Sequence, residues 1–212
     1  MPDTRIHAVI TGDLIASTTL PPAQADAAMS ALHSAARAWG GNLHFTRFRG
    51  DGWQILIDRP HSALRTALYM AAALAAADTG LSTRIAIGFG TATLRADDLS
   101  AATGTAFTRS GRALDHMPRR QRWAVSGGPG LPAWIPATLA LAEWHAARWT
   151  AGQAAVVADW LDPADRTQED RATRMGLTRQ AWKARFDGSG IAAWKPALDL
   201  WDGWNGEGIT GD

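Results

Sequence analysis

The chain has 212 residues, of which 46% are hydrophobic, and its formal net charge is +1. This size favours one large domain, or one domain with a small addition. The lack of cysteine excludes disulfides, thiolate chemistry and cysteine-ligated zinc. No apolar run approaches the roughly 20 residues of a membrane-spanning helix, and the first residues lack the pattern of a secretory leader. We therefore expect a cytoplasmic protein with no membrane partner.

The N-terminal part of the sequence predicts alternating strands and helices. Alternation of apolar residues indicates strands, and apolar stripes ended by glycine indicate helices. The predicted elements are a strand over 4–12, a helix over 21–39, strands over 42–49 and 53–58, a helix over 60–78, a strand over 82–90, a helix over 105–117 and a strand over 121–126. The order β-α-β-β-α-β-α-β predicts an α+β fold. It is typical of a ferredoxin-like split unit with one extra helix and strand.

The composition changes after a glycine- and proline-rich segment over 127–132. Nine of the eleven tryptophans lie between Trp123 and Trp204, and the apolar pattern becomes helical. We therefore predict a first domain over 1–128 and a small all-α domain over 133–204, with frayed residues after it.

Two acidic residues carry the chemistry of the first domain. Asp13 follows the first predicted strand, and Asp51 lies at the tip of the predicted hairpin in Gly50-Asp51-Gly52. A split sheet places these segments side by side, and two neighbouring carboxylates repel each other unless a cation lies between them. Oxygen ligands suit Mg²⁺ or Mn²⁺, which can position the phosphates of a nucleotide. The alternative is that Asp13 caps a loop and Asp51 only forms a turn.

Other sites have less support from the sequence. The six histidines are scattered, so a zinc centre is not expected, and no phosphate-binding P-loop motif occurs. Two stretches are rich in basic residues, five arginines over 109–122 and six bases over 166–185, and either could contact phosphate groups or be a solvated face.

Four ordered segments resemble a known family. They are Gly12-Asp13-Leu14-Ile15-x-Ser17, then Gly50-Asp51-Gly52-Trp53, then the stretch over 84–90, and finally Gly104-x-x-Phe107-x-x-x-Gly111-Arg112. The set resembles the catalytic domain of class III nucleotidyl cyclases. It resembles still more the bacterial SatD-like proteins, in which such a fold is followed by a helix-turn-helix.

The resemblance implies a set of functional residues and partners. Asp13 and Asp51 would be metal-binding and catalytic, with Arg112 at the α-phosphate and Thr108 where active cyclases usually carry asparagine. The nucleotide would be contacted by Gly12, Leu14, Ile15, Arg47, Arg49 and Gly50. Arg47 stands where purine-specific cyclases carry lysine, so the base is left open, and a planar guanidinium pairs differently with a base edge. The resemblance also implies a nucleoside triphosphate substrate and a head-to-tail homodimer.

These arginines also have plainer interpretations. Arg47 and Arg49 could be a solvated strand edge, and Arg112 could form an ion pair on a helix surface.

The segment over 167–187 predicts a helix-turn-helix. Ala172, Gly176 and Trp182 have the spacing of two helices that cross closely at a glycine turn, and Thr178 can cap the second helix. The exposed face of that helix would offer Arg179, Gln180, Lys183 and Arg185 to DNA. A small bundle that only packs against the first domain is the alternative. The net charge of −3 over 151–212 favours it.

Three functions follow from these observations. The leading hypothesis is a nucleotidyl cyclase or a related nucleotide-binding enzyme with an appended helix-turn-helix. The second is a DNA-binding regulator in which the cyclase-like domain is inactive and serves dimerisation or nucleotide sensing. The third is an interaction module without catalysis.

Overall fold

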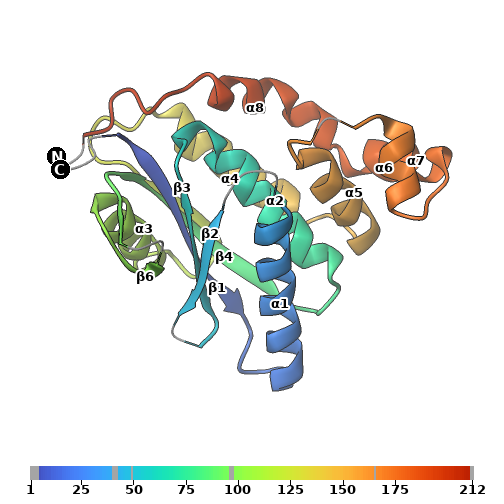
Figure 1. The fold of residues 1–212 in the computed structure, drawn as a ribbon, viewed down its shortest axis with the longest axis horizontal. Helices are drawn as coiled ribbons and strands as arrows, with labels where there is room; N and C mark the ends of the chain where they lie inside the picture. The colour runs from blue at the N-terminus through green and yellow to red at the C-terminus, as the bar shows by residue number, and fades with distance from the viewer. Residues whose placement is uncertain (1–4, 40–42, 49, 96–97, 165, 211–212) are drawn as a thin grey trace.

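The computed structural model describes residues 5–39, 43–48, 50–95, 98–164 and 166–210. Within these ranges the chain combines a five-stranded mixed sheet, a separate two-stranded sheet and eight α-helices (Figure 1). The predicted α+β class is confirmed. No helix in the described part of the chain has both the length and the apolarity needed to span a bilayer.

The elements agree with the predicted order and add a short hairpin. In chain order they are β1 (His7–Ile15), α1 (Pro22–Ala38), β2 (His44–Phe48), β3 (Gly52–Ile57), η1 (Pro60–Ser62), α2 (Ala63–Ala76), β4 (Ser82–Gly90), β5 (Thr93–Arg95), β6 (Asp98–Thr103), α3 (Thr105–Asp115), β7 (Trp123–Ser126), α4 (Trp134–Ala146), α5 (Ala151–Leu161), α6 (Gln168–Arg174), α7 (Arg179–Ser189), η2 (Ile191–Trp194) and α8 (Lys195–Asp202). Strands β5 and β6 were not predicted, because neither has a clear apolar alternation.

The strand order of the main sheet is β2-β3-β1-β4-β7. Strand β1 is central and pairs antiparallel with both β3 and β4, whereas β4 and β7 are parallel. The first strand was predicted to end at Gly12, but pairing continues to Ile15, which is opposite Ser82. Asp13 therefore lies inside the central strand rather than in the loop after it.

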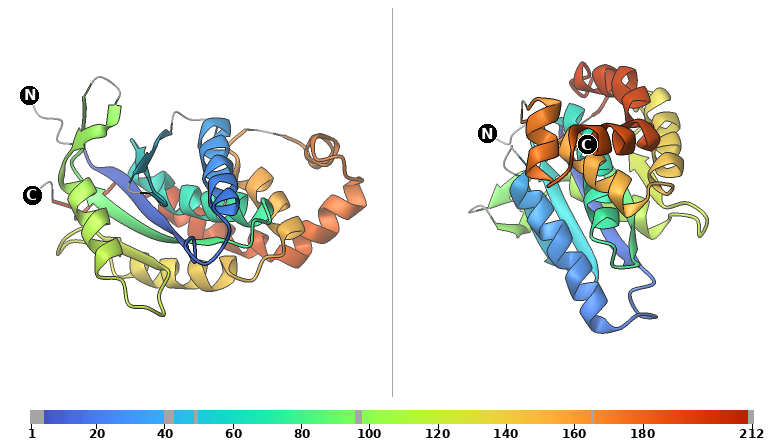
Figure 2. Two further views of the ribbon diagram at one scale, coloured as in Figure 1. Left: turned by 90° about the horizontal axis from the view of Figure 1, so that it is seen from below. Right: turned by 90° about the vertical axis from the view of Figure 1, so that its right-hand side faces the viewer.

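The two faces of β1 have different coverings. Ala8, Ile10 and Leu14 belong to the main core with residues of α1 and α2. Val9 and Thr11 point to the opposite face, where Val9 packs with Ala106 of α3. Helix α3 comes very close to β4, since a Cβ at Gly88 would lie 2.2 Å from the carbonyl oxygen of Ala106. Figure 2 shows α3 on one side of the sheet and α1 with α2 on the other.

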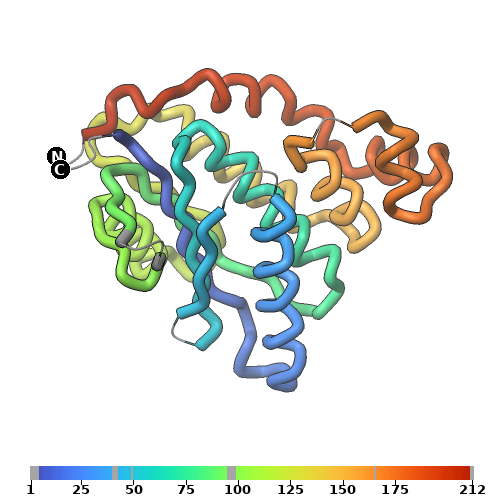
Figure 3. The backbone as a smooth tube through the Cα atoms, in the orientation of Figure 1, coloured from blue at the N-terminus to red at the C-terminus, as the bar shows by residue number. Residues whose placement is uncertain are grey.

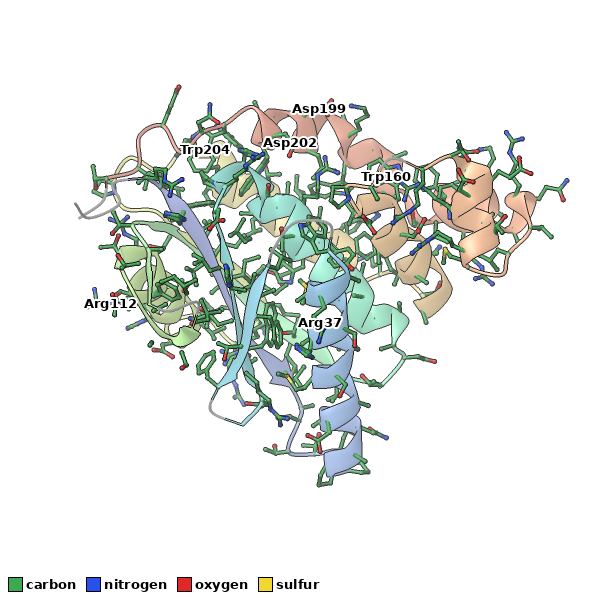
Figure 4. The ribbon with its side chains drawn as sticks, in the orientation of Figure 1. Arg37, Arg112, Trp160, Asp199, Asp202 and Trp204 are labelled. Atoms are coloured by element: carbon green, nitrogen blue, oxygen red, sulfur yellow. The ribbon has the colours of Figure 1, made fainter. Side chains whose placement is uncertain are left out.

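The main core continues across the predicted boundary between the two parts of the chain. It includes buried residues of α4, α5 and α8 together with those of the sheet. Aromatic contacts explain part of the tryptophan density, because Trp201 and Trp204 both pack against Phe89 of β4, and Trp134 packs against Trp201. Trp204 lies just beyond the end of α8 (Figure 4).

The predicted fraying after residue 204 is wrong for the described residues 205–210. This tail returns to the sheet domain (Figure 3), where Ile209 packs against the main core. The carbonyl oxygen of Thr210 accepts a hydrogen bond of 2.9 Å from Arg109. The tail therefore fastens the C-terminal helices to α3.

The α6–α7 segment has the geometry predicted for it. Ala172 and Trp182 are buried together with Val156 of α5. Gly176 has a φ of +64°, a conformation that costs glycine little. The hydroxyl of Thr178 caps α7 by accepting from the amide of Ala181 at 3.1 Å. In Figure 1 this pair of helices lies at the opposite end of the molecule from α3.

We expect Gly12→Ala to lower the free energy of unfolding by about 1–3 kcal/mol, the usual cost of overpacking. A Cβ at residue 12 would lie 2.5 Å from the indole ring of Trp53 and 2.6 Å from the carbonyl oxygen of Arg84. Urea denaturation measures the change. Gly111→Ala is the matched control, because nothing lies within 4 Å of its added Cβ in α3. That variant should gain up to about 1 kcal/mol from helix propensity. Equal losses in both variants would contradict the argument.

Candidate functional site

Asp13 forms an ion pair with Arg84 across the two neighbouring strands. The two residues are direct cross-strand partners of β1 and β4. Arg84 Nε donates to Asp13 Oδ1 at 2.8 Å, and its Nη2 donates to Oδ2, so the pair is bidentate. The Asp13 side chain is 23% exposed and that of Arg84 is 35% exposed. The pair therefore remains accessible from solvent.

Asp51 lies next to the same end of β1. Its carbonyl oxygen accepts a hydrogen bond of 3.2 Å from the amide of Leu14. Its carboxylate accepts from the hydroxyl of Ser17, in the loop that follows β1. Gly52, directly after Asp51, is the cross-strand partner of Asp13 on the other side of β1. The hairpin therefore brings the backbone of Asp51 beside that of Asp13 and Leu14, as the split arrangement predicted.

The charges at this end of the sheet act on Arg84. The pKa of Arg84 is raised above its ordinary value, chiefly because its guanidinium donates a hydrogen bond to Asp13. The negative charges of Asp13, Asp115 and Asp51 act in the same direction, whereas burial lowers the pKa. The Asp13 carboxylate contacts this guanidinium directly, whereas Asp51 is fixed beside the same end of β1 through its carbonyl oxygen, which accepts from the Leu14 amide.

We call Asp13 and Asp51 the carboxylate pair. Their side chains supply oxygen ligands, which are the ligands that Mg²⁺ and Mn²⁺ prefer. Magnesium is usually held by one or two carboxylates and completes its coordination with water and substrate phosphates. Among the described residues, no group of three or more histidine, cysteine or acidic side chains is arranged for a metal. An ion here would thus depend on the two carboxylates, backbone oxygens and phosphate. A carboxylate has about four lone-pair positions, so Asp13 can accept from Arg84 and still bind an ion.

Thr108 and Arg112 line a pocket of about 320 Å³ between α3 and the sheet. Both are exposed residues of α3 (Figure 4 labels Arg112). The sheet side of this pocket is formed by polar and aromatic residues of three strands, Thr11, Phe48 and Gln54. Hydrogen bonds hold the polar side chains at the sheet side of the pocket. Gln54 Nε2 donates to the Thr11 hydroxyl at 2.9 Å, and the Thr11 hydroxyl lies 2.8 Å from the Ser110 hydroxyl.

Arg47 lies on the other face of the sheet. Its Nη1 pairs with Asp26 of α1 at 3.2 Å, and its Nε donates to the carbonyl oxygen of Gly50 at 2.6 Å. It is therefore turned away from the α3 pocket, and a base contact by Arg47 in the same protomer would need both bonds to break. Gly50 forms the hairpin turn with a φ of +78°. Arg49 lies outside the described residues.

The remaining predicted nucleotide contacts have structural roles in this chain. Gly12 allows the indole of Trp53 to pack against β1. Leu14 is buried in the main core, and its amide is already bonded to Asp51. Ile15 ends β1 opposite Ser82. The Leu14 amide is therefore engaged in the fold and is not free to bind a phosphate.

Two residues of the site were not identified from the sequence. Arg84 was only part of a family-like stretch, and its contact with Asp13 depends on the register between β1 and β4. Ser17 was quoted in a motif without a role, although it binds the Asp51 carboxylate. The strand pairing, rather than any local pattern, brings Arg84 to Asp13.

The predicted DNA-contacting residues do not all share one face of α7. Arg179, Gln180 and Lys183 are exposed, and Lys183 pairs with Asp187 at 2.6 Å. Arg185 is exposed too, but its guanidinium lies 3.6 Å from a Cβ built on Gly152 of α5. It therefore lies on the flank that faces α5.

Part of the basic stretch over 166–185 is neutralised. Arg171 is buried and donates to the Asp159 carboxylate at 3.2 Å, which fastens α6 to α5. Arg166 pairs with Asp162 at 3.0 Å. These two arginines support the fold and are not available to phosphate groups.

Comparison with known proteins gives no assignment: no protein-family model matches the sequence, and no curated protein matches it.

The Arg84 guanidinium should compete with a divalent ion for Asp13. We expect Arg84→Gln to tighten Mn²⁺ binding about tenfold, because a positive charge next to the ion is removed. Titration calorimetry, or electron spin resonance of free Mn²⁺, measures the affinity. Arg65→Gln is the matched control, because Arg65 also pairs with an aspartate, Asp202 at 2.7 Å, on α8. An unchanged affinity in Arg84→Gln would show that the ion does not bind at Asp13.

Proposed function

We propose that the chain is a metal-dependent nucleotide-binding enzyme of the nucleotidyl cyclase type. The observation that carries the proposal is the meeting of two acidic segments at one end of the sheet. The Asp13 carboxylate binds the guanidinium of Arg84, and the carbonyl oxygen of Asp51 accepts from the amide of Leu14, the residue after Asp13. Two acidic residues at one end of the sheet, beside a partly exposed guanidinium, would provide a place where a metal ion and the phosphates of a nucleotide bind together.

The topology supports the same proposal. Strand β3 lies between β1 and β2, and β4 lies on the other side of β1. Helices α1 and α2 pack on one face of this split arrangement, and α3 packs on the other. A ferredoxin-like unit of this kind, extended by α3 and β7, is the fold that the resemblance to class III cyclases implies.

The proposed reaction converts a nucleoside triphosphate into a cyclic nucleotide and pyrophosphate. The 3′-oxygen forms a bond to the α-phosphorus, the bond from that phosphorus to the bridging oxygen breaks, and pyrophosphate leaves. The hydroxyl proton passes to water or to a basic oxygen at the site. A bound Mg²⁺ or Mn²⁺ would lower the pKa of the attacking hydroxyl and neutralise the leaving group. Asp13 and Asp51 would hold it.

A homodimer would bring the remaining residues to the substrate. Arg112 and Thr108 line the α3 pocket, whereas Arg47 lies on the α1 face with Asp26. One protomer therefore does not gather all the residues that the resemblance implies. A head-to-tail pair in which α3 of one protomer faces the carboxylate pair of the other would complete the site.

Asp51→Asn should abolish pyrophosphate release from a nucleoside triphosphate with Mn²⁺, because the variant loses one of the two charges that hold the ion. A coupled pyrophosphate assay with each of the four common triphosphates measures the activity. Asp199→Asn is the control, since Asp199 is an exposed acid on α8 that pairs only with Lys195 among the described residues. Activity retained in Asp51→Asn would end the proposal.

A second function, DNA binding by α6 and α7, is favoured by one specific observation. Arg179, Gln180 and Lys183 are exposed near the start of the second helix of a helix-turn-helix. In such motifs, residues in the first part of the recognition helix contact base edges. The protein would then be a regulator in which the cyclase-like part binds nucleotide or forms the dimer.

We expect Arg179→Ala to weaken binding to duplex DNA and to reduce the slope of log affinity against log salt by about one unit, as for one lost phosphate contact. Arg185→Ala removes the same charge from the flank of α7 that faces α5, so its effect should be smaller. Fluorescence anisotropy at several salt concentrations gives both values. Equal effects of the two variants would favour binding through net charge alone. If neither nucleotide turnover nor DNA binding occurs, the chain is an interaction module.

A further inference from the structure

A second basic surface lies on α4 and the loop before β7. Arg120 and Arg122 of this loop, Trp144 of α4 and Arg148, which lies two residues beyond the end of α4, line a surface pocket of about 450 Å³. We call these four residues the basic-aromatic patch. In the left panel of Figure 2 the loop lies beside α4, at the lower edge of the view. The patch belongs neither to the carboxylate pair nor to α7.

The lining of this pocket has three arginines and one acid, Glu143, which fixes the loop on the helix. Its two carboxylate oxygens accept hydrogen bonds of 3.0 Å from the backbone amides of Arg122 and Trp123. The Arg122 carbonyl oxygen accepts from the amide of Ile85 at 2.8 Å, which ties the loop to β4. The Glu143 carboxylate is thus engaged with backbone groups, and the loop that carries Arg120 and Arg122 is held in a defined position.

Trp144 presents an aromatic surface to solvent in the middle of these charges. Its side chain is among the few large apolar ones that are strongly exposed, at 58%. The guanidinium carbon of Arg148 lies 3.8 Å from the centre of the Trp144 ring. The guanidinium of Arg148 therefore covers part of the Trp144 ring, and the solvent-exposed part of the ring is accessible to a planar ligand.

The three arginines of the patch are not neutralised by acidic side chains. Within the ranges that the structure describes, Arg120, Arg122 and Arg148 take part in no ion pair. Many other basic residues of the chain do form such pairs, including Arg84, Arg166 and Arg171. Unpaired arginines around an exposed indole complement a ligand that has both negative charges and aromatic rings.

We propose that the basic-aromatic patch binds single-stranded nucleic acid. One base would stack on Trp144, and the neighbouring phosphates would contact Arg120, Arg122 and Arg148. A single strand fits better than a duplex, because stacking on a side chain requires an unstacked base. An acidic peptide would satisfy the arginines but would leave the indole exposed, so the aromatic group favours a nucleic acid. This function is independent of the nucleotide site at Asp13 and of α7.

The test uses the full-length protein and a fluorescent oligo-thymidine strand of about ten nucleotides, within the usual site size of such proteins. We expect Trp144→Ala to weaken binding about tenfold, as for the loss of one base stack. Leu200→Ala is the matched control, because Leu200 is a comparably exposed apolar residue, 54% exposed, on α8.

Replacing Arg120, Arg122 and Arg148 together by glutamine should lower the salt slope by about two units, at roughly 0.7 for each lost phosphate contact. Replacing the exposed Arg37, Arg59 and Arg174 by glutamine changes the net charge equally and should leave the slope almost unchanged. Thymidine monophosphate and a duplex of the same length should compete poorly with the strand.

Four results would overturn the proposal. The first is the absence of strand binding at low salt. The second is unaltered binding by Trp144→Ala. The third is an equal loss in the two triple variants, which would indicate attraction by net charge. The last is displacement of the strand by poly-glutamate or by the duplex as readily as by unlabelled strand, which would indicate a protein partner or a duplex site instead.

Discussion

The cross-strand pair of Asp13 and Arg84 is the constraint on which the candidate site depends. It joins the end of the central strand β1 to the start of β4, next to the hairpin that carries Asp51. An acidic side chain at this place in the sheet needs a compensating cation, and Arg84 supplies it from the neighbouring strand. The same contact defines the electrostatic field in which a metal ion would have to bind.

Helices α4, α5 and α8 share one hydrophobic core with the sheet. Trp201 and Trp204 pack on Phe89 of β4, and the tail reaches Arg109 of α3. Aromatic side chains bury large areas with few rotatable bonds, so they form a stiff connection. The chain thus combines a polar site at one end of its sheet with exposed basic residues on α7 and around Trp144.

The basic residues fall into two classes with different physical roles. Arg171 is bonded to Asp159 inside the fold, where an unpaired charge would be costly, and Arg84 is bonded to Asp13 in a partly exposed pair. Arg120, Arg122 and Arg148 lie at the surface around Trp144 and have no such partners in the described part of the chain. The formal net charge of +1 does not reveal this division, because it counts paired and unpaired basic residues alike.

The sequence by itself determined the α+β class, the order of the main elements and the pairing of Asp51 with the central strand. These follow from local patterns, namely apolar periodicity, the glycine turn at Gly50 and the cap at Thr178. The tertiary structure decided which side chains from distant parts of the sequence lie together, because local patterns do not contain this information. The register of β1 against β4 brought Arg84 to Asp13. The position of Arg47 on the α1 face of β2 directed its side chain to Asp26. The packing of α7 on α5 placed Arg185 on the side of α7 that faces α5. Each of these depends on residues far apart in the sequence, and a shift of one residue along a strand would reverse the face of every side chain.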